Sequence, residues 1–360
     1  MLSNLVDAFA TSAPSSQYII LSLLALPAIL VALYFLNSAP HIPKAVLVHP
    51  SLATLPTHFR SWQIYPEDAF TGGAYASLPL GRTRYWLLGP EDGTKIVLIP
   101  GLSMPALIWK DVAVLLAERG FRVLLYDLYG RGYSDAPQTT YDVPLFTTQL
   151  ALLLQCVGWD GANICGASMG GSIAAAFAVQ FPHLVRDNVA LIAPTGIVTP
   201  SDLPRMFRFL ASPLAQLVRS SAPFRVYLRR LSGSASRFDS ALDEIVHIQS
   251  ANLPGFNAAV ASTIRDGPIC GLTPTFVQLG KEMRKRMEAG APDGRVLLVW
   301  GTKDAVVPYT FAAHVRGLIG DDIATLTTFE GAIHDLIVTH AEETARELET
   351  FFARSKEQKT

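Results

Sequence analysis

The sequence predicts an α/β fold in which helices cover both faces of a mostly parallel β-sheet, with an inserted helical cap and a transmembrane helix in front. Short, continuous apolar runs alternate with stretches of helical periodicity, which is typical of parallel strands buried on both faces. Half of the 360 residues are apolar and 16% are charged, so a large core can form. The net charge of −1 provides no field that attracts nucleic acid, and no such partner is expected.

The N-terminal region predicts a membrane anchor. After a tail of residues 1–17, the segment Tyr18–Asn37 is uncharged and mostly apolar. As a helix it would span roughly 30 Å, the thickness of the hydrocarbon core of a bilayer. A signal peptide has a shorter apolar region preceded by positive charge. Here the only charged residue before Tyr18 is Asp7, so we expect a single-pass membrane protein.

Charge and cysteine content predict the side of the membrane. Lys44 and Arg60 follow the apolar segment, and the positive-inside tendency then keeps the following domain in the cytosol. Three cysteines are few and odd in number, so they imply no disulfide framework. Both observations fit a domain that faces a reducing compartment.

The elements of the sheet are expected in a regular order. Ala74–Pro79 and Arg82–Leu88 flank Gly81 and predict a β-hairpin. Further strands are expected at Lys95–Pro100, Phe121–Leu128, Ala162–Ala167, Asn188–Ala193, Arg295–Trp300 and Thr325–Phe329. Helices are expected at Pro105–Arg119, Pro144–Val157, Met169–Phe181, Phe311–Ile319 and Ala341–Phe352.

The alternation stops between about Thr199 and Pro292, where the pattern is helical without a strand of the same kind. Open α/β sheets bind ligands at the carboxyl ends of their strands, so we expect this insertion to cap that edge. The expected division is a Pro-rich linker at 38–70, a core at 71–198 and 293–360, and a helical cap at 199–292.

A Gly-Ala-Ser-Met-Gly sequence at residues 166–170 is the sharpest local signal. It follows an apolar strand and opens an Ala-rich helix, a setting that places the serine on a tight, strained turn. The glycines leave room for the close approach of strand and helix. Ser168 is therefore the candidate nucleophile. The alternative is a glycine-rich turn with an incidental serine.

A serine hydroxyl needs a base, and the chain contains eight histidines. Only His334 lies in a loop just after the last predicted strand. Asp304 follows the strand after the cap, where its carboxylate could fix the imidazole tautomer. The chain order Ser168, Asp304, His334 differs from the orders of chymotrypsin-like and subtilisin-like enzymes. The neighbouring Asp335 is expected to cap the following helix.

A tetrahedral intermediate requires two backbone N–H donors. Met169, directly after the candidate nucleophile, would supply one. Leu102, in the turn after the first parallel strand, would supply the other. An alternative for this turn is an ordinary strand-to-helix connection in which Ser103 only caps the helix that begins near Pro105.

These segments together resemble the α/β-hydrolase superfamily, in its cap-bearing branch of lipases, esterases and carbon–carbon hydrolases. The resemblance covers roughly the last four-fifths of the chain. Relatives usually have His-Gly where this chain has Pro100-Gly101. Relatives with an aspartate nucleophile, the epoxide hydrolases and haloalkane dehalogenases, do not match Ser168. The matching residues are Pro100-Gly101, Asp127–Asp135, Gly166–Gly170, Gly301–Asp304 with Val307-Pro308, and Gly331–His334.

The resemblance implies a serine hydrolase that cleaves a carboxylic ester through an acyl-serine intermediate, without a metal or organic cofactor. With the apolar anchor, it suggests a lipid-like substrate of the monoacylglycerol type, so a small-molecule ester and the membrane are the expected partners. Two alternatives remain open, a carbon–carbon bond hydrolase with the same three residues and a membrane-tethered binding protein without activity. The oligomeric state is not predicted.

The cap contains one further signal. Between Asp202 and Asp239 lie seven arginines and no acidic residue, interleaved with large apolar side chains. This pattern suits an interfacial helix on an anionic membrane surface. A cap helix with a solvated basic side is an equal alternative.

Overall fold

The computed structural model of the chain describes residues 25–27, 29, 46–199, 240–289 and 294–357. The chain forms two compact units, Met1–Val46 and Leu47–Thr360. Within the expected transmembrane segment, the described residues 25–27 and 29 are helical and exposed. None of the described helices is both long enough and apolar enough to cross a bilayer. The rest of that segment and the arginine-rich stretch of the cap lie outside the described residues.

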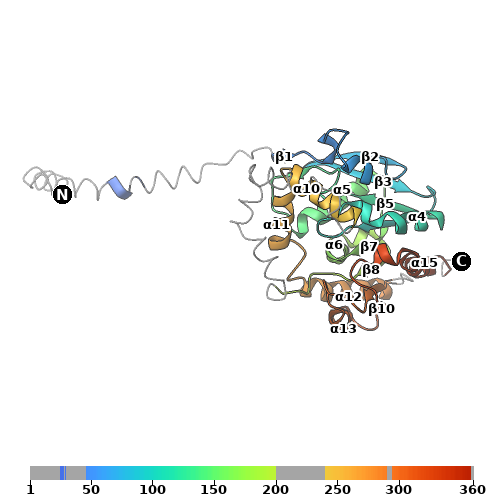
Figure 1. Cartoon of the computed structure of the whole chain (residues 1–360). Coiled ribbons are helices and arrows are strands. Elements are labelled where there is room, and N and C mark those ends of the chain that lie inside the picture. The colour runs from blue at the N-terminus through green and yellow to red at the C-terminus, as the bar shows by residue number, and fades with distance from the viewer. Residues whose placement is uncertain (1–24, 28, 30–45, 200–239, 290–293, 358–360) are drawn as a thin grey trace, which may run out of the picture. The chain divides into compact units, whose positions relative to one another are not determined.

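Over the described residues, eight strands form one sheet in the order β10-β9-β8-β7-β4-β5-β3-β2 (Figure 1). β2 and β3 form the predicted hairpin, and β3 pairs antiparallel with β5, whereas the other neighbours pair in parallel. The mostly parallel sheet is thereby confirmed. Its strands are β2 (Gly73–Leu78), β3 (Gly81–Leu88), β4 (Thr94–Ile99), β5 (Phe121–Tyr126), β7 (Ala162–Ala167), β8 (Val185–Ile192), β9 (Val296–Gly301) and β10 (Ala324–Phe329).

The helices also follow the predicted order, with boundaries shifted by a few residues. The helix expected at Pro105–Arg119 begins as a 3₁₀ turn, η2 (Ala106–Trp109), before α4 (Lys110–Glu118). The other helices of the core are α5 (Val143–Cys156), α6 (Met169–Gln180), α12 (Thr273–Glu288), α13 (Thr310–Ile319), α14 (Leu336–Thr339) and α15 (Ala341–Glu357).

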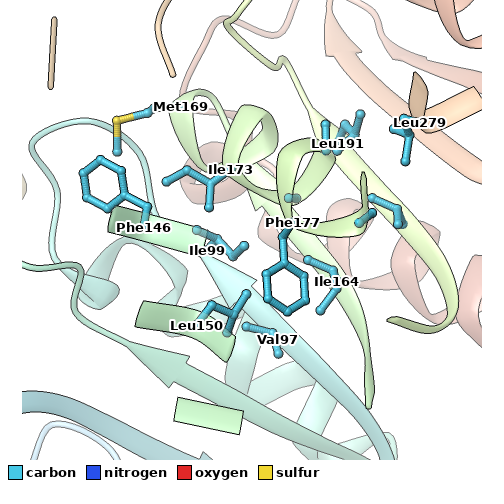
Figure 2. Close-up of a cluster of buried hydrophobic side chains, with 14 of the residues drawn as sticks. Val97, Ile99, Phe146, Leu150, Ile164, Met169, Ile173, Phe177, Leu191 and Leu279 are labelled. Carbon is cyan, nitrogen blue, oxygen red and sulfur yellow. The ribbon is translucent and has the colours of Figure 1, made fainter. Parts of the chain in front are cut away.

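Two hydrophobic layers cover the sheet, one on each face. Val97 and Ile99 of β4 pack with buried residues of α5, α6, α12 and α13, and Figure 2 shows part of this layer. Ile96 and Leu98, which alternate with them, pack with buried residues of α4 and α15. This alternation explains why β4 is apolar throughout, because both of its faces are covered by helices.

The structure corrects the extent of the predicted cap. Helix α12 packs against α6 and α13, and its Phe276, Leu279 and Met283 are buried in the core layer. A Cβ atom at Gly280 would lie 1.9 Å from the Ile319 carbonyl oxygen, so the two helices are in close contact. The last part of the predicted cap 199–292 therefore belongs to the core. α10 (Ala241–Asn252) and α11 (Phe256–Asp266) are the described cap helices.

The predicted linker 38–70 is also too long. Residues from Leu47 onward belong to the larger compact unit. Leu52 and Tyr65 are buried, and a short helix, α3 (Ser61–Ile64), packs against α10. In addition, β1 (Val48–His49) pairs with β6 (Ala136–Pro137). Proline content suggested an extended connector, but the apolar residues between the prolines find partners on the folded domain.

Candidate active site

Ser168 lies at the end of β7, directly before α6, with φ 56° and ψ −121°. Left-handed backbone is rare for a residue with a side chain and costs about 1–3 kcal/mol, so the surrounding structure must impose it. The Ser168 N–H donates to the Ile192 carbonyl at 2.8 Å. The Ser168 carbonyl accepts from Gly171 N–H at 3.0 Å and Thr195 N–H at 3.3 Å. Hydrogen bonds therefore hold both the N–H group and the carbonyl group of Ser168, the predicted nucleophile.

The glycines around Ser168 are required by close backbone contacts. A Cβ atom at Gly170 would lie 2.2 Å from the Ile99 carbonyl oxygen at the end of β4. A Cβ atom at Gly166 would lie 2.0 Å from the Gly170 carbonyl oxygen. Real Cβ atoms do not approach other atoms so closely, so α6 can begin against β4 only because these positions lack side chains.

Asp304 and His334 meet in the structure as predicted from their positions in the chain. His334 Nδ1 lies 2.7 Å from Asp304 Oδ2. The other carboxylate oxygen, Oδ1, accepts from the N–H groups of Val306 at 2.9 Å and Val307 at 2.8 Å. The Asp304 side chain is fully buried, whereas that of His334 is 23% exposed. Because an ionised carboxylate only accepts hydrogen bonds, Nδ1 must carry the proton and Nε2 is left as the acceptor of a neutral imidazole.

The loops that carry this pair are held together by their backbones. Lys303 N–H donates to the Ala332 carbonyl at 2.9 Å. A Cβ atom at Gly301 would lie 2.3 Å from the same carbonyl oxygen. This close approach brings the end of β9 beside the loop that follows β10. Among the described hydrogen bonds, His334 is joined to Asp304, and none joins His334 to Ser168 Oγ.

The predicted N–H donors also lie near Ser168. Met169 is the first residue of α6, where the N–H groups of the first turn have no intrahelical acceptor and favour negative charge. Leu102 follows Gly101, and a Cβ atom at Gly101 would lie 3.6 Å from the Ser168 Cβ. The turn after β4 therefore passes directly beside the Ser168 side chain.

A family model described as the alpha/beta hydrolase family matches residues 96–347. The chain belongs to this family. A non-heme chloroperoxidase of Streptomyces lividans is 27% identical over 265 residues, which cover 71% of this chain and 90% of that protein. The resemblance predicted from the motifs is thus confirmed.

Solved structures of the same fold include esterases and lipases. A bacterial membrane phospholipase A matches with a TM-score of 0.60 and 22% identity, covering 94% of this chain and 99% of that one. A carboxylesterase of Bacillus subtilis matches with a TM-score of 0.60 and 17% identity, covering 81% of this chain and 94% of that one. At these identities the likeness establishes the α/β-hydrolase fold alone.

One buried carboxylate near the site was not given a role by the sequence. Asp127, directly after β5, accepts hydrogen bonds from Ala106 N–H at 2.7 Å, Tyr133 N–H at 2.7 Å and the Tyr65 hydroxyl at 3.1 Å. It thus joins the start of η2, the loop after β5 and the segment before β2. Its position in the motif Asp127–Asp135 was visible in the sequence, but its partner Tyr65 lay in the segment taken for a linker.

Burial raises the pKa of Asp127 to about 7, although hydrogen bonds from Ala106, Tyr133 and Tyr65 lower it. Between about pH 4 and 7 the folded chain keeps a proton on Asp127 that the unfolded chain releases. The contribution of this carboxyl group to stability therefore falls as the pH rises through that range.

We expect Asp127→Asn to reduce this pH dependence, because asparagine does not titrate. The measurement is the free energy of unfolding in urea at pH 5 and pH 7. The wild type should lose more stability than Asp127→Asn between the two pH values. Asp111→Asn, at an exposed position on α4, is the control and should behave like the wild type. Equal losses in the wild type and Asp127→Asn would contradict the raised pKa.

Proposed function

We propose that this alpha/beta hydrolase is a serine hydrolase that cleaves carboxylic esters. The observation that carries the proposal is the hydrogen bond between the buried Asp304 carboxylate and His334. It lies at the carboxyl edge of the sheet, where Ser168 occupies a strained left-handed turn. Backbone strain of this kind persists where function requires a side chain to be presented.

In the proposed reaction, His334 Nε2 takes the proton of the Ser168 hydroxyl while Oγ attacks the ester carbonyl carbon. The carbonyl oxygen becomes an oxyanion, which accepts hydrogen bonds from the N–H groups of Leu102 and Met169. The carbon–oxygen bond to the alcohol then breaks, and His334 returns the proton to the leaving alcohol. His334 then deprotonates a water molecule, whose oxygen attacks the acyl carbon of the acyl-serine. The bond between this carbon and Ser168 Oγ breaks, His334 returns the proton to Oγ, and the acid is released. Asp304 keeps the imidazole in the required tautomer throughout.

A lipid-like ester, of the monoacylglycerol type, is the proposed substrate class. Val306 is 66% exposed and Ile333 is 50% exposed, and they lie beside Asp304 and His334 in the chain. Apolar side chains at this position suit an acyl chain better than a charged substrate. The membrane phospholipase A of the same fold supports a lipid substrate as well.

We also propose that Tyr18–Asn37 anchors the chain in a membrane as a single-pass helix, with the hydrolase domain on the cytosolic side. Leu26 is 54% exposed and Ile29 is 52% exposed, as expected of lipid-facing side chains. The charge bias that supports this orientation comes from Lys44 and Arg60. Arg60 Nε also lies 2.7 Å from Glu244 Oε1 of α10.

The proposed nucleophile can be tested by labelling with a fluorophosphonate, which phosphonylates activated serines. We expect the wild type to be labelled and to hydrolyse p-nitrophenyl esters, because His334 would activate the Ser168 hydroxyl as its base. Ser168→Ala should lose both properties. Ser77→Ala, at an exposed position on β2, is the matched control and should keep both. An unlabelled wild type, or labelling that survives Ser168→Ala, would refute the proposal.

The proposed anchor predicts that full-length protein stays in membranes during carbonate extraction. The double substitution Leu26→Asp and Ile29→Asp should release it, because each charge at the centre of a membrane helix costs about 2.5–3.5 kcal/mol. Leu5→Asp, in the tail before the segment, should have no effect. Extraction of the wild type by carbonate would show that the segment does not span the bilayer.

A further inference from the structure

Arg131 is a completely buried arginine in the loop after β5. Within the described part of the chain, no carboxylate lies within salt-bridge distance of its guanidinium. Instead, Nε donates to the Leu102 carbonyl at 2.8 Å, Nη1 to the Tyr129 carbonyl at 2.9 Å and Nη2 to the Thr263 hydroxyl at 2.9 Å. The guanidinium carbon also lies 5.7 Å from the ring centre of Tyr141.

Burying a charge without a counter-ion costs free energy, because the charge loses its hydration and gains no ion pair in return. Burial lowers the pKa of Arg131 to about 10, which still leaves it charged at neutral pH. Its three neutral acceptors and the aromatic ring are the interactions that offset the loss of water. An apolar residue could fill the same volume without losing hydration. We therefore infer the function of Arg131 from the groups to which its guanidinium donates hydrogen bonds.

The first of these bonds reaches the turn that passes beside Ser168. Leu102 is the proposed oxyanion donor, and the Arg131 bond fixes the direction of the Leu102 carbonyl. A carbonyl oxygen turned toward an oxyanion would repel it. Holding this carbonyl in a charge-assisted hydrogen bond leaves the turn in one conformation, in which the N–H groups remain available.

The last of the bonds reaches the cap. Thr263 is fully buried on α11, and its hydroxyl donates to the Ala259 carbonyl at 2.7 Å while it accepts from Arg131. The same loop is tied to the cap at a second place, because Gly132 N–H donates to Gln249 Oε1 of α10 at 2.7 Å. Arg131 therefore links a cap helix directly to the turn beside the nucleophile.

We propose that Arg131 is a positioning residue that holds the Leu102 turn in the conformation required for oxyanion binding and makes that conformation depend on cap helix α11 through Thr263. This inference rests on the proposed ester hydrolysis by Ser168. Loss of one oxyanion donor typically lowers kcat about 10²–10³-fold, so a donor that is misplaced for part of the time should have a smaller effect.

The test uses the full chain with Thr263→Val, which removes the acceptor at nearly constant volume, and Thr263→Ser, which keeps it. Rates are normalised to the concentration of active sites titrated with a fluorophosphonate. We expect Thr263→Val to lower kcat about tenfold with little change in KM, and Thr263→Ser to retain kcat. Arg131→Lys, which keeps the charge but cannot reach all three acceptors, should lower kcat more.

A second readout separates positioning from a general weakening of the fold. Each variant is also assayed with the thionoester that matches the ester substrate, because sulfur is a weak hydrogen-bond acceptor and gains little from an oxyanion hole. A misplaced turn should reduce the ratio of ester to thionoester hydrolysis, whereas a loosened fold should slow both alike.

The outcomes distinguish this inference from the proposed function. A wild type without Ser168-dependent ester hydrolysis would overturn both. Ser168-dependent hydrolysis in which Thr263→Val and Arg131→Lys keep the wild-type ratio would overturn the role of Arg131 alone. Equal kcat values for Thr263→Val and Thr263→Ser would also overturn the role of Arg131 alone. If Thr263→Val unfolds at the assay temperature, the ratio of ester to thionoester hydrolysis in Arg131→Lys tests the role of Arg131 instead.

Discussion

The left-handed turn at Ser168 is the constraint on which the rest of the site depends. Its backbone is unfavourable by about 1–3 kcal/mol in isolation, so it exists only while its neighbours hold it. Those neighbours come from β8, from the loop that follows β8 and from β4. Ile192 at the end of β8 accepts the Ser168 N–H, Thr195 donates to its carbonyl, and the end of β4 packs directly against Gly170. A change in the spacing of these strands would therefore displace the serine.

Two buried carboxylates organise the loops at this edge of the sheet. Asp304 binds two N–H groups of its own loop through one oxygen, which leaves the other oxygen for His334. Asp127 similarly binds the N–H groups of Ala106 and Tyr133, and so links the helical turn after β4 to the loop that contains Arg131. Each carboxyl group replaces lost water with hydrogen bonds, as the burial of a polar group requires. Hydrogen bonds thus order these loops, whereas apolar packing orders the sheet and the helices that carry them.

The sequence predicted the sheet and the positions of Ser168, Asp304 and His334 because these follow from local patterns. β4 is continuously apolar since both faces are covered, and the serine lies between a strand and a helix that can be read directly. The extent of the cap was not predictable in this way. Helix α12 has the periodicity of any amphipathic helix, and its contacts with α6, and with α13 through Gly280, place it in the core.

The buried network was missed for a related physical reason. Tyr65 meets Asp127 across 62 positions in the chain, and Arg131 meets Thr263 across 132 positions. Such partners are joined by the fold and leave no periodic signal. The proline residues before Tyr65 also indicated an extended connector, although the apolar residues between them pack on the domain. The contacts of Asp127 and Arg131 with these distant segments could not be inferred from a single sequence.

The central claim is that the buried carboxylate of Asp304 orients His334 as the base for Ser168. Its most direct test is kcat for ester hydrolysis in Asp304→Asn compared with Asp335→Asn. Asparagine can still accept the N–H groups of Val306 and Val307, but its amide cannot stabilise the protonated imidazole. We predict that Asp304→Asn lowers kcat about 10³–10⁴-fold with the fold intact, while Asp335→Asn, at an exposed position beside His334, changes kcat less than about threefold. Near-normal turnover in Asp304→Asn, or an equal loss in both variants, would contradict the account.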